Sequence, residues 1–158
     1  MTAKTFEVTG GDKLAKALKE IAARLGNSGA SVKVGFLEGA TYPGTDDAPG
    51  LPVAQVAFWN EYGTTKQPPR PFFRNAIKKG SPEWGAKFAA ALKAADYNNE
   101  TALGIMGEVI KGEVVQSIID TNEPALAPST VKRKGFAKPL IDTGVMQRAV
   151  AYVVQNGS

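Results

Sequence analysis

Residues 61–73, which read EYGTTKQPPRPFF, constrain the fold more than any other stretch of this chain. Proline fixes its own φ and disfavours the helical conformation in the residue before it, so the three prolines here hold an extended path. Gly63 can end a helix before that path, and Pro71 can begin another after it, with Pro69 in the path itself. The segment therefore predicts a rigid corner between two helices.

The polar and aromatic side chains of this corner suggest how it is fixed. Arg70 stands between prolines, and we expect it to form a bidentate ion pair with Glu61. Of the two adjacent aromatic residues, one can enter the core while the other faces a groove or a partner. We assign Phe72 to the internal structure and Phe73 to an interface.

Apolar periodicity predicts the elements on either side of the corner. Helical spacing indicates a helix at 12–25, a short one at 53–62, and separate helices at 71–79 and from Ser81. Ser81 can cap this last helix with Pro82 at its first position, and Glu83 faces Lys87 one turn later. Asn98 or Asn99 can cap a longer helix reaching about residue 121, and Ser129 a short turn. Alternation predicts strands at 6–9, 31–38 and 149–155.

This order predicts the fold class. Strands, a block of helices and a terminal strand indicate one α+β domain over residues 1–158, with a small, mainly antiparallel sheet and helices packed on one face. Residues 39–52 (GATYPGTDDAPGLP) form a long loop rich in Gly, Pro and Asp. A loop of that length is often functional, and we expect this one to become ordered on assembly.

Composition narrows the function. The 158 residues include no cysteine and no histidine, which removes thiol and imidazole nucleophiles, Ser-His-Asp triads, usual zinc sites and disulfides. Asp46 and Asp47 could bind a divalent cation, but turn formation explains them better. No carboxylate pair or phosphate loop is indicated, and no apolar run has the length of a membrane span. We predict a soluble protein that is not an enzyme, with no cofactor, no metal and no membrane partner.

The net charge of +4 is mild, and its main cluster is a basic turn. Lys132, Arg133 and Lys134, with Lys138 nearby, could contact phosphates. This basic turn, residues 132–138, supports an alternative reading as a nucleic-acid-binding module, although no sequence-reading motif accompanies it. The favoured reading is a solvated or interfacial turn.

Aromatic residues and arginine are the side chains that most often anchor protein interfaces. Together with the loop and the basic turn, they give these candidate interface residues: Tyr42, Asp46, Asp47, Trp59, Arg70, Phe73, Lys132, Arg133 and Lys134.

Two blocks of the sequence resemble tailed-bacteriophage neck and tail-completion proteins. In that family a VGF-type strand precedes a Gly/Pro loop, a helix ending in N-E-[FY]-G-T, and then P-x-R-P-F. A later block carries K-P-L-x-D-T-G before a short helix and a strand. The matching residues are Val34, Gly35, Phe36, Asn60 to Thr64, Pro68, Arg70, Pro71 and Phe72, then Leu126, Ser129, Thr130, Lys134, Lys138, Pro139, Leu140, Asp142, Thr143 and Gly144.

The resemblance implies a tail-terminator-like fold and a virion structural protein, assembled in the host cytoplasm. Its subunits would form a homo-oligomeric ring, a hexamer or alternatively a dodecamer, that completes or terminates the tail. The implied neighbours are the head connector or stopper and the tail tube proteins. DNA would pass nearby without specific binding.

Overall fold

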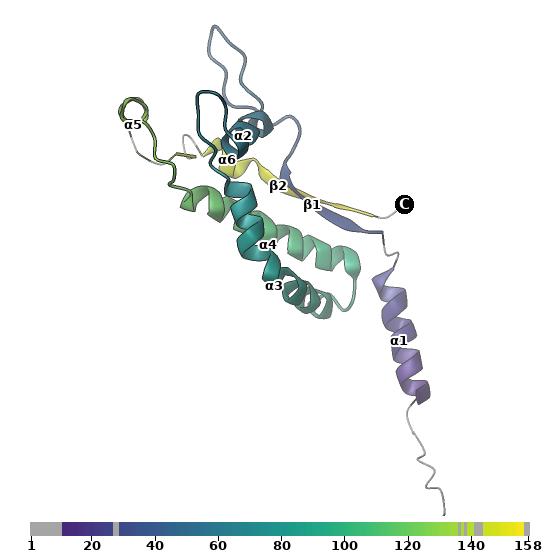
Figure 1. Cartoon of the computed structure of the whole chain (residues 1–158). Helices are drawn as coiled ribbons and strands as arrows, with labels where there is room; N and C mark the ends of the chain where they lie inside the picture. Colours follow the sequence, from purple (N-terminus) through teal and green to yellow (C-terminus); the bar gives the residue numbers. More distant parts are fainter. Residues whose placement is uncertain (1–10, 27–28, 136, 138, 141–143, 157–158) are drawn as a thin grey trace, which may run out of the picture.

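The computed structural model describes residues 11–26, 29–135, 137, 139–140 and 144–156. The predicted strand at 6–9 and the residues Lys138, Asp142 and Thr143 lie outside the described residues. The elements are α1 (Gly11–Leu25), β1 (Ser31–Phe36), α2 (Val53–Tyr62), α3 (Phe72–Ala94), α4 (Asn99–Asp120), α5 (Pro128–Lys134), α6 (Val145–Arg148) and β2 (Val150–Gln155). This arrangement confirms the predicted small α+β fold (Figure 1).

The sheet consists of β1 and β2, which pair antiparallel from Ser31 opposite Gln155 to Phe36 opposite Val150. Because side chains alternate along a strand, the register places Val34 and Tyr152 on the same face. Helix α4 packs against both strands and against α3, so the sheet and the two long helices form successive layers (Figure 1).

The core lies where α2, α3, α4, α6 and β2 meet. The ring of Phe72 at the start of α3 meets Phe36 of β1 edge to face, with the ring centroids 6.2 Å apart. Aromatic pairs favour this geometry because the positive ring edge faces the negative ring face. The buried apolar residues of this core are Val53, Ala57, Phe72, Ala76, Val114, Ile118, Leu140, Met146 and Val150.

Most of the predicted element boundaries agree with the structure. Helix α2 has the predicted bounds, and α4 begins after Asn98, whose side chain accepts a hydrogen bond from the backbone nitrogen of Thr101 at 2.8 Å. This is the expected N-cap, which satisfies one of the free amides of the first turn.

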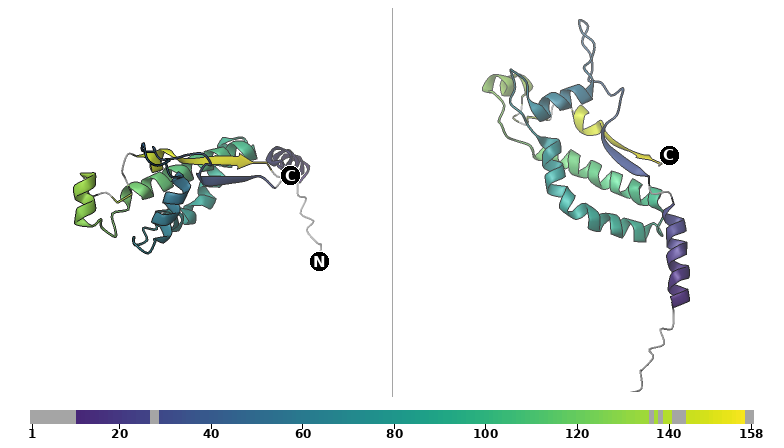
Figure 2. Two further views of the ribbon diagram at one scale, coloured as in Figure 1. Left: turned by 90° about the horizontal axis from the view of Figure 1, so that it is seen from above. Right: turned by 45° about the vertical axis from the view of Figure 1, so that its right-hand side comes forward.

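The predicted break at Ser81 is wrong, because α3 is one helix with Pro82 inside it. Proline removes one backbone donor and clashes with the carbonyl four residues earlier, here that of Lys78. Both residues are exposed, so water can satisfy the freed carbonyl. The buried positions Ala76, Gly80 and Ala91 continue on both sides of the proline, and packing against α4 therefore keeps the helix continuous. The axis of α3 changes direction along its length (Figure 2), as expected for a proline kink.

Candidate assembly surfaces

The corner predicted at residues 61–73 is fixed by the carboxylate of Glu61, which lies at the end of α2 and is 5% exposed. It accepts hydrogen bonds from the backbone nitrogens of Phe73 (2.8 Å) and Arg74 (3.2 Å) in the first turn of α3. It also accepts one from Nε of Arg74 at 2.7 Å. Glu61 thus caps α3 from a neighbouring helix, where the helix dipole favours a negative charge.

The expected ion pair between Glu61 and Arg70 is wrong. Arg70 is only 4% exposed, and it donates from Nε to the carbonyl of Pro124 at 2.9 Å and from Nη2 to that of Ala125 at 3.4 Å. Burial lowers the pKa of Arg70, although a guanidinium remains protonated in proteins. Arg74 takes its place beside Glu61, because the first turn of α3 brings that side chain back over the corner.

The remaining corner residues have distinct environments. Gly63 has φ 79°, and a Cβ there would lie 2.9 Å from the nitrogen of Pro69, so the chain reversal requires glycine. Pro69 is exposed and Pro71, the residue before α3, is half-buried. Phe73 is half-buried at the margin of the core, and Trp59 is half-buried on α2.

The loop at 39–52 forms a hairpin that projects from the body (Figure 1). Its arms are joined by hydrogen bonds from the nitrogen of Tyr42 to the carbonyl of Leu51 (2.9 Å) and between Thr45 and Ala48 in both directions. A Cβ at Gly50 would lie 1.8 Å from the carbonyl oxygen of Tyr42, so a glycine lets the arms approach. The hairpin is thus closed by hydrogen bonds within one chain, and the expectation that it becomes ordered on assembly stays a prediction.

The predicted residues of this hairpin lie at its two ends. Tyr42 is half-buried at the base, against the core, whereas Asp46 and Asp47 occupy the exposed turn at the tip. Among the described residues, no three acidic side chains gather closely enough to hold a metal ion.

The basic turn begins in α5, a short helix that stands off the body (Figure 1). Lys132 and Arg133 are exposed, and neither has an ion-pair partner within the part of the chain that the structure describes. Lys134 ends the helix. Further on, Gly144 has φ 71° and precedes α6, in which Met146 is buried in the core.

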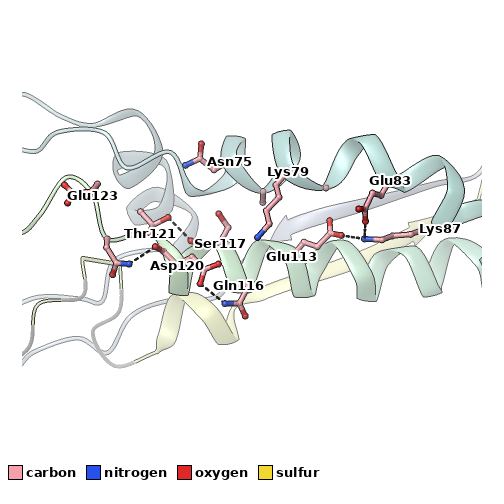
Figure 3. A pocket seen from close by; sticks show the side chains of 13 residues that line it. Asn75, Lys79, Glu83, Lys87, Glu113, Gln116, Ser117, Asp120, Thr121 and Glu123 are labelled. Atoms are coloured by element: carbon pink, nitrogen blue, oxygen red, sulfur yellow. Dashed lines mark hydrogen bonds and ion pairs between the residues drawn. The ribbon is translucent and has the colours of Figure 1, made fainter.

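A cleft of about 620 Å³ between α3 and α4 was not predicted from the sequence (Figure 3). Glu113 of α4 accepts hydrogen bonds from Trp84 Nε1 and Lys87 Nζ of α3, each at 2.7 Å. Lys87 also pairs with Glu83 at 3.1 Å, which confirms that predicted contact. A Cβ at the buried Gly80 would lie 2.2 Å from Glu113 Oε2, so this glycine makes room for the carboxylate. Because Gly80 was placed between two predicted helices, its role inside α3 was missed.

These contacts shift the pKa of both partners. Hydrogen bonds to Glu113 and then Glu83 raise the pKa of Lys87. Burial acts to raise the pKa of Glu113, but the hydrogen bonds from Lys87 and Trp84 and the nearby lysine charges outweigh it, and its pKa is lowered.

The lowered pKa predicts a specific acid dependence of stability. Glu113 stabilises the fold at pH values above its unfolded pKa of 4.5, and this contribution is lost as the pH falls through the lower folded value. Glu113→Gln should therefore flatten the fall in the free energy of unfolding between about pH 6 and pH 3, measured by urea titration. Glu108→Gln is the control, because Glu108 is exposed and only 3.5 Å from Lys111. If the free energy of unfolding fell equally steeply with decreasing pH in both variants, Glu113 would not be the source of this acid dependence.

Comparison with protein-family models, curated proteins and solved structures finds no match to this chain. The resemblance to phage neck proteins therefore rests on the residues named above and stays a prediction. No described helix combines the length and the apolar character needed to cross a membrane.

Proposed function

We propose that this chain is a structural, non-enzymatic subunit of a tailed-bacteriophage head–tail junction. It forms a ring, sixfold or alternatively twelvefold, that completes or terminates the tail and joins it to the head connector. Its other partners are the tail tube proteins, and its location is the neck of the virion.

The observation that supports this most is that the two sequence blocks meet in space. Arg70 of the first block donates to the carbonyls of Pro124 and Ala125, which directly precede the second block at Leu126. Leu140 and Met146 of the second block enter the same core as Phe72 of the first. Two short motifs that pack together are better explained as parts of one family pattern than as separate chance matches.

Physical considerations agree with a ring subunit. A ring needs heterologous contacts, in which one surface of a subunit meets a different surface of the next. The hairpin, α1 and α5 all extend from the body (Figures 1 and 2), and elements of this kind can reach a neighbour.

The test is to examine the purified protein, alone and with tail tubes, by mass photometry and electron microscopy. We expect closed rings that cap tube ends. Deleting residues 45–50 should leave a folded monomer, because the Tyr42–Leu51 hydrogen bond at the hairpin base and the core lie outside the deletion, and it should impair assembly. Normal assembly of the deletion variant would contradict the role of the hairpin.

The basic turn supports the alternative function in nucleic-acid binding, because Lys132 and Arg133 are exposed and unpaired among the described residues. A protein that stays monomeric with tail tubes but binds DNA tightly at physiological salt, and loses that binding in Lys132→Glu/Arg133→Glu, would replace the first proposal with this one.

A further inference from the structure

Helix α1 carries an apolar stripe whose outer half, at Leu14 and Leu18, is exposed in the described chain. Leu14 and Leu18 are 62% and 56% exposed, Ile21 and Leu25 are half-buried, and no residue of the helix is buried. These four residues follow i, i+4, i+7 and i+11 spacing and share one face. The helix points away from the body (Figures 1 and 2). A lone helix of about 15 residues is only marginally stable in water, so α1 needs a surface that buries its apolar stripe.

The polar faces of α1 are mainly basic. Lys13, Lys16, Lys19 and Arg24 outnumber Asp12 and Glu20. Arg24 pairs with Asp96 at 2.5 Å and thereby ties the end of α1 to the turn between α3 and α4. Two α1 helices packed side by side would bring like charges together, which makes self-pairing of the stripe unfavourable and favours an acidic partner surface.

The cleft between α3 and α4 has the complementary character. The buried Ala76 and Gly80 line this cleft. So do Glu83, Asp120 and Glu123, whose side chains are labelled in Figure 3. Four carboxylates line the cleft against two ammonium groups, and one of those ammonium groups, that of Lys87, is already paired with two of the carboxylates. The cleft therefore combines small buried residues with a net negative lining.

We propose that α1 of a second copy of this chain lies in the cleft. At 1.5 Å per residue the stripe from Leu14 to Leu25 is about 16 Å long, and the α3 wall, residues 75–87, is about 18 Å long. The basic faces of α1 then meet the carboxylates that line the cleft, while its leucines lie along the α3 wall, which is the helix-in-groove mode of recognition. In this arrangement the α1 helix of a subunit does not lie in the cleft of the same subunit, because it leaves the body at the α3–α4 turn and runs outward (Figure 1).

This contact joins two different surfaces of the same chain, so it is heterologous and passes from each subunit to the next. This inference rests on the proposed function in one respect, namely that the copies close into a ring. To that function it adds the identity of the two surfaces that join neighbouring subunits.

The absence of cysteine permits a direct test in the full chain. Leu18→Cys protein is mixed with Gln116→Cys protein, whose cysteine stands on the cleft wall, and the mixture is oxidised. We expect a disulfide between these two positions, identified by mass spectrometry. The matched control is Ala23→Cys, an exposed position on the opposite face of α1, which should give at least about tenfold less of this product.

A second variant measures the contribution of the stripe. Leu18→Asp should weaken self-association in mass photometry by at least about tenfold, because a carboxylate would replace a leucine that the proposed contact buries. Ala23→Asp should not. Since no α1 residue is buried, both variants should unfold at the denaturant concentration of the parent.

Three other outcomes would overturn the contact between α1 and the cleft. A disulfide that forms within one chain carrying both cysteines, at high dilution, would show that α1 folds onto its own cleft and would overturn the inference. Rings that are unaffected by Leu18→Asp would overturn it while leaving the proposed function intact. A parent protein that neither associates nor cross-links would overturn it, and the tail-tube experiment would then decide the proposed function separately.

Discussion

Replacing Glu61 with alanine should lower the free energy of unfolding by about 2–4 kcal/mol. The carboxylate is buried and satisfies two backbone amides in the first turn of α3 as well as Arg74. Truncation leaves those amides without a partner in a place that water reaches poorly. The Arg74 side chain is half exposed, so its ion pair is partly screened and the amides provide most of the effect.

Urea unfolding followed by circular dichroism gives the measurement, with Glu108→Ala as the control. Glu108 is exposed and contacts Lys111 at 3.5 Å, so its loss should change stability by no more than about 0.5 kcal/mol. Glu61→Gln should lie between the two, because the amide keeps one acceptor oxygen but turns a donor towards a backbone donor. A Glu61→Ala protein as stable as the control would show that the cap does not hold the corner.

The local part of the fold was predictable because its signals are local. The alternation of apolar and polar residues predicted β1 and β2, and the glycine at Gly63 predicted the end of α2. The break expected between residues 79 and 81 was wrong because a tertiary effect outweighed a local one. Burial of Ala76, Gly80 and Ala91 against α4 exceeds the cost of the hydrogen bond lost at the exposed Pro82.

The partners of charged residues were harder to predict, because they depend on distances across the fold. Arg70 and Glu61 are close in sequence and opposite in charge, yet Arg70 reaches the connector after α4, more than fifty residues away. Glu113 meets Trp84 and Lys87 only because α3 and α4 pack side by side. For the same reason, the cleft between those helices could not be read from either helix alone.

The corner has a consequence for assembly. Glu61 fixes the start of α3, and Arg70 fixes the connector that leads to α5, so one segment sets the directions of two elements. One wall of the cleft lies on α3, and the exposed Lys132 and Arg133 lie on α5. A rigid corner therefore keeps two candidate contact surfaces at a constant separation, as subunits in a closed ring require.

The same substitution at two glycines of α4 should change stability in opposite directions. A Cβ at Gly107 would lie 2.2 Å from Cδ2 of Tyr152 and under 3 Å from two more ring atoms. Gly107→Ala should cost about 1–3 kcal/mol of unfolding free energy, because the whole ring and β2 must shift. At Gly104 nothing lies within 4 Å, so Gly104→Ala should gain about 0.5–1 kcal/mol from helix propensity alone.

A double-mutant cycle identifies the cause of the Gly107 effect. Tyr152→Ala removes the ring, so adding Gly107→Ala to that variant should no longer destabilise it and should give the gain seen at Gly104. Urea midpoints of the four proteins provide the coupling energy. If Gly107→Ala remains destabilising without the ring, the close contact with Tyr152 is not what requires glycine, and α4 does not pack on β2 through this position.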